Sequence, residues 1–355
     1  MKGLILAAGL GTRLRPITSL KPKPTISVAN RPLIHHAVQN LVDAGVSEIG
    51  IVVSHDTIKH LQASLEDYPG ASFTYLIQDP PLGLAHAVKV SRGFLGDSPF
   101  VMYLGDNLFE QGIGRFVDAY RPEDGVNAVL ALVPVDDPRQ LGVAVVKDGR
   151  IIELVEKPEV PPSNLAIAGV YVLDASIHPI IEELKPGAKD EYQITDAIHD
   201  LIRQGGHVAP VQVEGWWKDT GKPEDILDAN RLLLMRIGRQ VDGAVEDSEL
   251  VGDVVVEAGA NVKGSTVFGP VIIGAGARVE RSYLGPFTTV GPGSVIEDAE
   301  VEYSVIGSDT SIRDIGTRVR ESLIGDGVRL EGTDNRPGSH RLVIGDESEV
   351  LLHER

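Results

Sequence analysis

Residues 4–16, Leu4-Ile5-Leu6-Ala7-Ala8-Gly9-Leu10-Gly11-Thr12-Arg13-Leu14-Arg15-Pro16, join a short apolar run to a glycine-rich turn and two arginines. The apolar run Leu4–Ala8 predicts a buried strand. Glycine at positions 9 and 11 lets backbone N–H groups approach a ligand closely. A strand that ends in such a turn and is followed by cations predicts an anion site, with polyphosphate as the expected anion.

The charge around this turn differs from that of the whole chain. The 355 residues carry 33 Lys and Arg against 51 Asp and Glu, a net charge of −18. The first acidic residue is nonetheless Asp43, and the stretch before it carries Lys2, Arg13, Arg15, Lys21, Lys23 and Arg31. A locally positive turn favours an anionic ligand, whereas the acidic remainder argues against nucleic acid or an anionic membrane as a partner.

Composition narrows the class of protein further. The chain has no cysteine, which excludes disulfides and thiolate chemistry. Its apolar runs are too short to cross a bilayer. The N-terminus enters a predicted strand at once, without the basic region and longer apolar core of a secretory signal. We therefore expect a cytoplasmic protein.

Two sequence patterns divide the chain into an expected domain at 1–240 and a second at 241–355. In the first, apolar runs alternate with stretches of helical periodicity. The runs are Leu4–Ala8, Ile49–Val53, Phe100–Leu104, Ala128–Val133 and Val170–Leu173, and the helical stretches are Leu33–Ala44, Leu84–Phe94 and Asp196–Gln204. This alternation predicts an α/β fold with a Rossmann-like, mainly parallel sheet sandwiched by helices. Ligands of such sheets bind beyond the carboxyl ends of strands, where Gly9–Gly11 and Gly105-Asp106-Asn107 lie.

The second domain repeats a Val-Gly or Ile-Gly pair. The pairs at Ile273, Val290, Ile306 and Ile324 are 17, 16 and 18 residues apart, and apolar residues between them recur every five or six positions. Three such steps per period describe a triangular coil of short parallel strands, a β-helix. The alternative is an irregular set of short antiparallel strands joined by glycine turns.

The residues near the glycine turn suggest how a phosphate is held. Arg13 offers a planar fork for two oxygens, and Lys23 stands between two prolines that fix its backbone. A dinucleotide fingerprint would need glycine where Leu14 stands, and no Gly-Lys-Ser/Thr follows as a Walker loop requires. The plain alternative is a solvated loop whose lysines bind nothing.

Together with the motifs that follow it, this turn resembles the signature of the sugar-1-phosphate nucleotidylyltransferases. The further motifs are Pro22-Lys23-Pro24, Gln78-Asp79-Pro80-Pro81-Leu82-Gly83-Leu84-Ala85, Leu104-Gly105-Asp106-Asn107, Glu156-Lys157-Pro158, Ala168-Gly169-Val170-Tyr171, Gln193-Ile194-Thr195-Asp196 and Trp217-Lys218-Asp219-Thr220-Gly221. They follow the family's order and cover most of the first 225 residues. The chain is most similar to long-form members that join dTTP to glucose 1-phosphate and carry a C-terminal left-handed β-helix of hexapeptide repeats.

The resemblance implies attack by a sugar-phosphate oxygen on the α-phosphorus of a nucleoside triphosphate, with release of pyrophosphate. The implied catalytic residues are Arg13, Lys23, Asp106, Lys157 and Asp219. Arg13 would stabilise the departing pyrophosphate, Lys23 would bind phosphate oxygens near the reacting centre, and Lys157 would hold the sugar phosphate. The two aspartates, Asp106 and Asp219, would bind Mg²⁺, which takes few protein carboxylates and completes its shell with water and phosphate oxygens.

The same resemblance implies two sets of binding residues. The nucleotide-binding set is Leu6, Ala8, Gly9, Gly11, Thr12, Arg13, Gln78, Pro81, Gly83 and Asp106. The sugar-phosphate set is Asn107, Gly142, Glu156, Lys157, Gly169, Tyr171 and Lys189. The family usually has arginine at the position of Lys189, and lysine keeps the charge but loses the bidentate fork. The Gln78 amide suits thymine or uracil but can also face adenine.

Several of these residues also have plain structural explanations. Asp106 and Asp219 can each belong to an ordinary turn. Glu156 and Lys157 can form a surface ion pair, and Tyr171 can be a core aromatic.

At the level of function, three alternatives stay open. The first is the same chemistry with UTP or another triphosphate. The second is a regulatory homologue that binds nucleotide without turnover. An acyltransferase site in the β-helix is the third, although residues 241–355 contain only His340 and His353 as candidate bases. Because stacked coils have open ends that need covering, we also expect a homo-oligomer.

Overall fold

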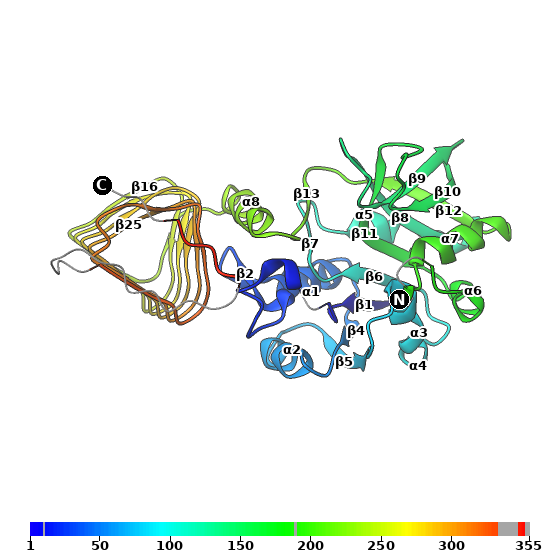
Figure 1. Cartoon of the computed structure of the whole chain (residues 1–355), viewed down its shortest axis with the longest axis horizontal. Coiled ribbons are helices and arrows are strands. Elements are labelled where there is room, and N and C mark those ends of the chain that lie inside the picture. The colour runs from blue at the N-terminus through cyan, green and yellow to red at the C-terminus, as the bar shows by residue number, and fades with distance from the viewer. Residues whose placement is uncertain (10, 188–189, 333–346, 352–355) are drawn as a thin grey trace. The chain divides into compact units, whose positions relative to one another are not determined.

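The computed structural model describes residues 1–9, 11–187, 190–332 and 347–351. Its chain packs into two compact units (Figure 1). The first contains residues 1–10, 22–25 and 33–219, and the second contains residues 11–21, 26–32 and 220–355. The boundary expected after residue 240 marks the point where the sequence pattern changes. As a domain boundary it stays a prediction.

A nine-stranded sheet forms the centre of the first unit. Its main order is β10 (Arg150–Glu156), β9 (Gly142–Lys147), β11 (Leu165–Leu173), β6 (Phe100–Leu104), β1 (Lys2–Leu6), β4 (Glu48–Val53) and β5 (Ser72–Ile77), with β8 (Val126–Pro134) on β11 and β12 (His207–Gln212) on β8. The strands from β6 to β5 pair in parallel, as do β8 and β12. Strand β11 instead pairs antiparallel with β6, β8 and β9. The α/β class is confirmed, and the sheet is mixed.

Helices cover this sheet, and its two faces carry separate cores. The helices are α1 (Leu33–Asp43), α2 (Ile58–Leu65), α3 (Leu84–Val90), α4 (Arg92–Leu95), α5 (Gly114–Asp118), α6 (Ile177–Glu183) and α7 (Ile194–Arg203), with short 3₁₀ turns η2 (Lys23–Thr25) and η3 (Pro122–Asp124). Neighbouring residues of β1 enter opposite cores, because side chains alternate along a strand: Leu4 packs in one core and Ile5 in the other. Continuous apolar strands therefore indicated a sheet buried on both faces.

Two expected elements differ from the structure. The strand expected over Leu4–Ala8 is found over Lys2–Leu6. Ala7 and Ala8 lie buried beyond its end, where the Ala7 N–H still donates to the Val52 carbonyl at 2.9 Å. The helix expected over Leu84–Phe94 breaks into α3 and α4 at Ser91. The Ser91 hydroxyl, fully buried, donates to the Ala87 carbonyl at 2.7 Å, a bond that often bends helices.

The second unit contains three sheets whose short strands all pair in parallel, and Figure 1 shows them stacked in successive coils. The first sheet is β14 (Gln240–Val241), β17 (Val254–Val256), β20 (Val271–Ile273), β23 (Thr288–Val290), β26 (Val305–Ile306) and β29 (Leu323–Ile324). The second is β15 (Ala244–Glu246), β18 (Asn261–Lys263), β21 (Arg278–Glu280), β24 (Val295–Glu297), β27 (Ser311–Arg313) and β30 (Arg329–Glu331). The third is β16 (Glu249–Val251), β19 (Thr266–Phe268), β22 (Tyr283–Leu284), β25 (Glu300–Glu302) and β28 (Val319–Arg320).

The register confirms the period seen in the sequence. Ile273 pairs with Val290, Val290 with Ile306, and Ile306 with Ile324, so successive coils take 17, 16 and 18 residues. Inward-facing residues such as Val279, Ile296 and Ile312 form one continuous core. This regular repeat fits the expected left-handed parallel β-helix, and the alternative of antiparallel strands is wrong.

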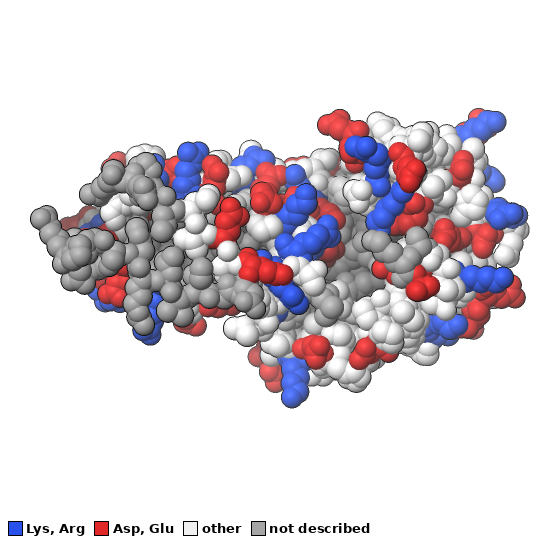
Figure 2. Space-filling model, viewed as in Figure 1, with Lys and Arg blue, Asp and Glu red and all other residues white. Residues whose placement is uncertain are grey.

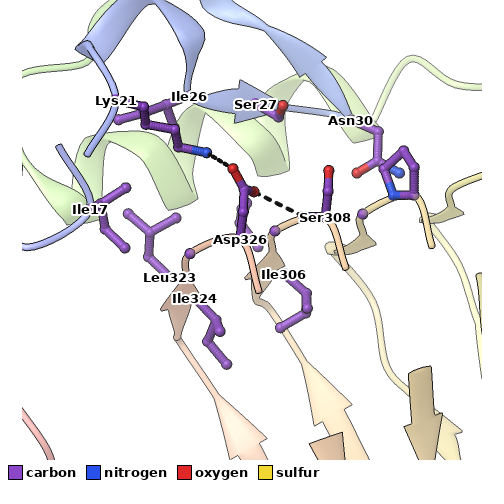
Figure 3. Close-up of a pocket in the computed structure, with 15 residues that line it drawn as sticks. Ile17, Lys21, Ile26, Ser27, Asn30, Ile306, Ser308, Leu323, Ile324 and Asp326 are labelled. Carbon is purple, nitrogen blue, oxygen red and sulfur yellow. Dashed lines mark hydrogen bonds and ion pairs between the residues drawn. The ribbon is translucent and has the colours of Figure 1, made fainter. Parts of the chain in front are cut away.

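Residues from near the N-terminus pack on this β-helix within the second unit. They include the 3₁₀ turn η1 (Thr12–Leu14) and the hairpin β2 (Ser27–Val28) with β3 (Arg31–Pro32). Lys21 Nζ lies 2.6 Å from Asp326 Oδ2, and Asp326 Oδ1 accepts from the Ser308 backbone N–H at 2.9 Å (Figure 3). Asn30 also donates to the Val290 carbonyl at 2.8 Å. Figure 3 shows the contacts of Asp326 with Lys21 and Ser308 among the residues of a pocket whose apolar lining includes Ile17 and Leu323.

Helix α8 (Pro223–Leu234) provides a second attachment for the same residues. The Asn230 side chain, almost fully buried, accepts from the Ala29 N–H at 2.8 Å and donates to the Phe287 carbonyl at 3.2 Å. One amide therefore joins the hairpin region, α8 and a coil of the β-helix.

We expect Ile296→Ala to destabilise the β-helix by about 2–5 kcal/mol, because the truncation leaves a cavity in a core where Ile296 is fully buried. Denaturant unfolding followed by circular dichroism measures the change. The matched control is Ile152→Ala in β10, where the side chain is 45% exposed and the same truncation is expected to cost less than about 0.5 kcal/mol. Equal unfolding midpoints for the two variants would contradict the continuous core.

Candidate active site

A buried lysine lies beside two aspartates in the first unit. Lys23, only 8% exposed, begins η2. Its Nζ lies 2.6 Å from Asp106 Oδ2 and 3.8 Å from Asp219 Oδ1. The two carboxylates are about one-third exposed on their side chains, so the cluster is open to solvent on their side. The structure thus brings together three of the residues that the sequence suggested.

Backbone pairing explains how residues so distant in the chain meet. Asp106 follows β6, whose parallel neighbour β1 ends at Leu6, and the Gly105 N–H donates to the Leu6 carbonyl at 3.1 Å. Strand β13 (Trp217–Asp219) pairs antiparallel with β7 (Asn107–Phe109), which sets Asp219 opposite Asn107. Both aspartates therefore lie at the carboxyl end of the central strands, where α/β sheets bind ligands.

Asn107 orients the Asp106 carboxylate. It is 3% exposed, donates to Asp106 Oδ1 at 2.8 Å and accepts from the Trp217 indole N–H at 2.7 Å. Gly169 packs on the same amide, since a Cβ added to Gly169 would lie 2.7 Å from Asn107 Oδ1, and its φ of +71° also favours glycine. A direct contact of Asn107 or Gly169 with a sugar phosphate stays a prediction.

The donor set of this cluster fits a hard divalent cation. Asp106 and Asp219 supply two carboxylates around one position, and the Lys23 ammonium beside them shows that the position attracts positive charge. The described residues contain no group of three or more His, Cys, Asp or Glu side chains arranged around a metal position. Two carboxylates suffice for Mg²⁺ when water and phosphate oxygens supply the other ligands.

A second polar group lies at the ends of β9 and β10. Glu156 accepts from the Thr195 hydroxyl at 3.1 Å, and its other oxygen lies 2.9 Å from Lys157 Nζ. Gly142 stands opposite Glu156 in the ladder, and a Cβ there would lie 2.9 Å from the Thr195 methyl group. The Lys157 side chain is 52% exposed, so this ion pair contributes little to stability, and its role toward a substrate stays a prediction.

The remaining sugar-phosphate candidates differ in their surroundings. Tyr171 in β11 is buried in the core, and burial together with the Glu156 charge raises the pKa of its phenol above the usual range. Asp196 in α7 also has a raised pKa, caused first by burial and then by the Glu156 and Asp200 charges. Lys189 lies outside the described residues.

The expected base-reading loop has a buried glutamine at its start. Gln78 follows β5, is 5% exposed, and donates its amide N–H to the Gly83 carbonyl at 2.9 Å. The same amide nitrogen lies 3.2 Å from His86 Nδ1. Pro81, also expected to bind nucleotide, is exposed. The structure therefore brings Gln78 and Gly83 together and adds His86, which the sequence had not suggested.

We expect Gly83→Ala to raise the KM for the nucleoside triphosphate about tenfold, because Gly83 has a φ of +101° and an added Cβ would lie 2.6 Å from the Tyr192 carbonyl oxygen. Steady-state kinetics with varied triphosphate measures the effect. The control is Gly93→Ala, where an added Cβ meets no described atom within 4 Å. An unchanged KM in Gly83→Ala would show that the loop conformation does not matter for binding.

The glycine turn is divided between the two units. Leu6, Ala8 and Gly9 belong to the first unit, where Ala8 is buried and Gly9 exposed. Gly11, Thr12 and Arg13 belong to the second.

The part of the turn in the second unit is fixed at Gly11 and exposed beyond it. Gly11 has a φ of +61°, and its carbonyl accepts from the Leu14 N–H at 3.0 Å and the Thr18 hydroxyl at 2.8 Å. Thr12 and Arg13 are exposed, and a Cβ added to Gly221 would lie 3.5 Å from the Arg13 guanidinium nitrogens.

The surface carries charges of both signs. Figure 2 shows Lys and Arg interspersed with Asp and Glu over the described residues of the face in view, without one continuous basic area there. Among the helices that the structure describes, none has the length and apolar character needed to cross a bilayer.

Some contacts of the site gave no clear sequence signal. Trp217 and Thr195 lie within the quoted motifs, but their hydrogen bonds to Asn107 and Glu156 depend on chain pairing over long distances. His86 and Tyr192 lie just outside the quoted motifs. The position of His86 in the first turn of a helix that follows a glycine loop was the available hint.

Comparison with known proteins gives consistent results. The family described as nucleotidyl transferase matches residues 2–236. The low-salt glycan biosynthesis nucleotidyltransferase Agl11 of Haloferax volcanii is 44% identical over 99% of this chain and 100% of its own length. A glucose-1-phosphate thymidylyltransferase of Streptomyces griseus is 43% identical over 99% of both chains. A crystal structure of UDP-glucose pyrophosphorylase complexed with UDP-glucose has a TM-score of 0.60 at 28% identity, over 66% of this chain and 98% of that one.

Proposed function

Since this chain belongs to the nucleotidyl transferase family and is of the sugar-1-phosphate kind, we propose that it transfers a nucleotidyl group from dTTP to glucose 1-phosphate, with Mg²⁺. The products would be dTDP-glucose and pyrophosphate. The observation that carries the proposal is the convergence of Lys23, Asp106 and Asp219 beyond the carboxyl ends of β6 and β1.

The reaction joins two anions, so the main task of the protein is to offset their repulsion and hold them in line. Lys23 binds phosphate oxygens near the reacting phosphorus, and Arg13 stabilises the pyrophosphate as negative charge builds on it. Lys157 binds the phosphate of the sugar, while Glu156 accepts hydrogen bonds from ring hydroxyls. No general base is needed, because a phosphate monoester is already an anion at neutral pH.

Asp106 and Asp219 are the residues that would hold the magnesium ion. When bound, the ion would neutralise charge on the phosphate oxygens. Asn107 and Trp217 keep the Asp106 carboxylate in a fixed orientation for this purpose.

The choice of nucleotide rests on the similarity to the thymidylyltransferase of Streptomyces griseus over nearly the whole of both chains. The UDP-glucose pyrophosphorylase with bound UDP-glucose favours UTP as the alternative, but its sequence identity to this chain is lower and it covers less of the chain. A non-catalytic homologue is disfavoured, because such a protein has no need of a buried lysine beside two aspartates. For the acyltransferase alternative, the two histidines of residues 241–355, His340 and His353, lie outside the described residues. A cytoplasmic location and a homo-oligomeric state stay predictions.

The test is pyrophosphate release from a panel of nucleoside triphosphates combined with a panel of sugar 1-phosphates, at saturating Mg²⁺. We expect the highest kcat/KM with dTTP and glucose 1-phosphate. A higher kcat/KM with UTP would replace the nucleotide and leave the chemistry in place. Absence of release with every pyrimidine triphosphate would reject the proposal, and acetyl-CoA consumption with glucosamine 1-phosphate would support an acyltransferase instead.

A further inference from the structure

We propose that His86 determines the choice of base by fixing the Gln78 amide so that its oxygen alone faces the nucleotide. The inference rests on the proposed function and adds a positioning residue to it. It starts from two contacts of one amide nitrogen, to the Gly83 carbonyl at 2.9 Å and to His86 Nδ1 at 3.2 Å.

The Gly83 carbonyl decides which end of the Gln78 amide points inward. A carbonyl oxygen can only accept a hydrogen bond, so the amide atom 2.9 Å from it is the nitrogen. The reversed amide would set two oxygens against each other. Because Gln78 is 5% exposed, that repulsion would have no solvent to relieve it.

His86 then takes the second amide hydrogen. Its Nδ1 faces the Gln78 amide nitrogen, which can only donate a hydrogen bond. Nδ1 is therefore the acceptor, and the ring is neutral with its proton on Nε2. Burial, and after it the Lys89 ammonium, lower the pKa of His86 below its usual value of 6.5, so this form is present at neutral pH.

The His86 ring is itself held in place. It stacks on the Tyr192 ring with centroids 6.2 Å apart and planes at 29°. The Tyr192 backbone also bonds the loop, because its carbonyl accepts from the Ala85 N–H at 3.0 Å and its N–H donates to the Leu82 carbonyl at 2.8 Å. Gln78, the loop and His86 therefore form one rigid group. The charged or titratable groups that face His86 are the Lys89 ammonium and the Tyr192 ring.

With both amide hydrogens in use, Gln78 Oε1 remains as the hydrogen-bonding atom for a base. It can accept the imino N–H of thymine or uracil. Cytosine carries a lone pair at the same ring nitrogen, and two acceptors repel each other. A glutamine that can turn over would serve either base, whereas a fixed one selects the base with the imino N–H.

The experiment compares two substitutions at His86 in the full chain. His86→Phe keeps a ring to stack on Tyr192 but removes the acceptor. His86→Asn keeps an oxygen close to the position of Nδ1. We expect His86→Phe to lower the ratio of kcat/KM for dTTP to that for dCTP about tenfold or more, and His86→Asn to restore most of it. Equal melting temperatures would separate this effect from a loss of fold.

A pH series on the wild type gives a second readout that does not depend on the folding of a variant. As pH falls through the pKa of His86, Nδ1 gains a proton and becomes a donor facing a donor. The triphosphate tail titrates in the same range, but equally in dTTP and dCTP. The ratio of kcat/KM for dTTP to that for dCTP should therefore fall in acid for the wild type and stay flat for His86→Asn.

The outcomes separate this inference from the function on which it rests. Turnover with an unchanged dTTP-to-dCTP ratio in His86→Phe, or an acid fall of that ratio that persists in His86→Asn, would overturn the role of His86 alone. Absence of turnover with every triphosphate would overturn the proposed function and the inference together.

Discussion

Asp219→Asn is expected to lower turnover at least about 100-fold while the protein stays folded. The substitution keeps the size of the side chain but removes a negative charge from one of the two carboxylates beside Lys23. The backbone pairing of β13 with β7 does not depend on that charge, so the melting temperature should change little. Pyrophosphate release at increasing Mg²⁺ measures the effect, and the variant should need more Mg²⁺ than the wild type to reach half of its own maximal rate.

The matched control is Asp118→Asn, which alters an exposed aspartate of α5. Its turnover and Mg²⁺ dependence should equal those of the wild type. An Asp219→Asn variant as fast as the wild type at saturating Mg²⁺ would remove Asp219 from the metal site and leave Asp106 to be tested in the same way.

Lys23→Met is the substitution for which we expect the second large loss, about 10²- to 10³-fold in kcat. Methionine fills a similar space at a position that is 8% exposed, but it leaves Asp106 and Asp219 without the ammonium that now lies 2.6 and 3.8 Å from them. It also removes the cation expected to bind phosphate oxygens. Single-turnover measurements, which separate chemistry from product release, are the appropriate assay.

Two further variants test whether the loss is specific to Lys23 and whether its charge alone is sufficient. Lys59→Met alters an exposed lysine of α2 and should leave kcat unchanged. Lys23→Arg keeps the charge but places a larger planar group in a buried position, so we expect an intermediate rate. If Lys23→Arg were as slow as Lys23→Met, geometry rather than charge would be the decisive property of Lys23. Wild-type rates in Lys23→Met would exclude the lysine from catalysis.

Features of the fold that repeat, or that follow one strand, were predictable from the sequence. The spacing of Ile273, Val290, Ile306 and Ile324 appears unchanged in the register, because each coil of a β-helix stacks directly on the one before it. The runs of apolar residues likewise located the sheet strands, since burial on both faces leaves no room for polar alternation.

Contacts that depend on very short strands, on one side-chain rotamer or on a loop conformation were not predictable from sequence patterns, and only the family resemblance implied that Asp106 and Asp219 meet. Strands β7 and β13 have three residues each, too few to show a period, yet their pairing brings Asp219 to Asp106. The break at Ser91 depends on one hydroxyl that turned inward. The contact of Gln78 with His86 depends on the conformation of the loop between them, which the side-chain types alone do not define.

The attachment of residues 11–21 and 26–32 to the coils through Lys21, Asn30 and Asn230 bears on how such genes recombine. An exchange of C-terminal portions between two relatives at residue 240 would match each β-helix with a foreign N-terminal loop. Asp326 would then face whichever residue the other parent has at position 21. Hybrids in which residues 11–32 and the β-helix come from the same parent should be more stable to unfolding than hybrids with a single crossover at residue 240.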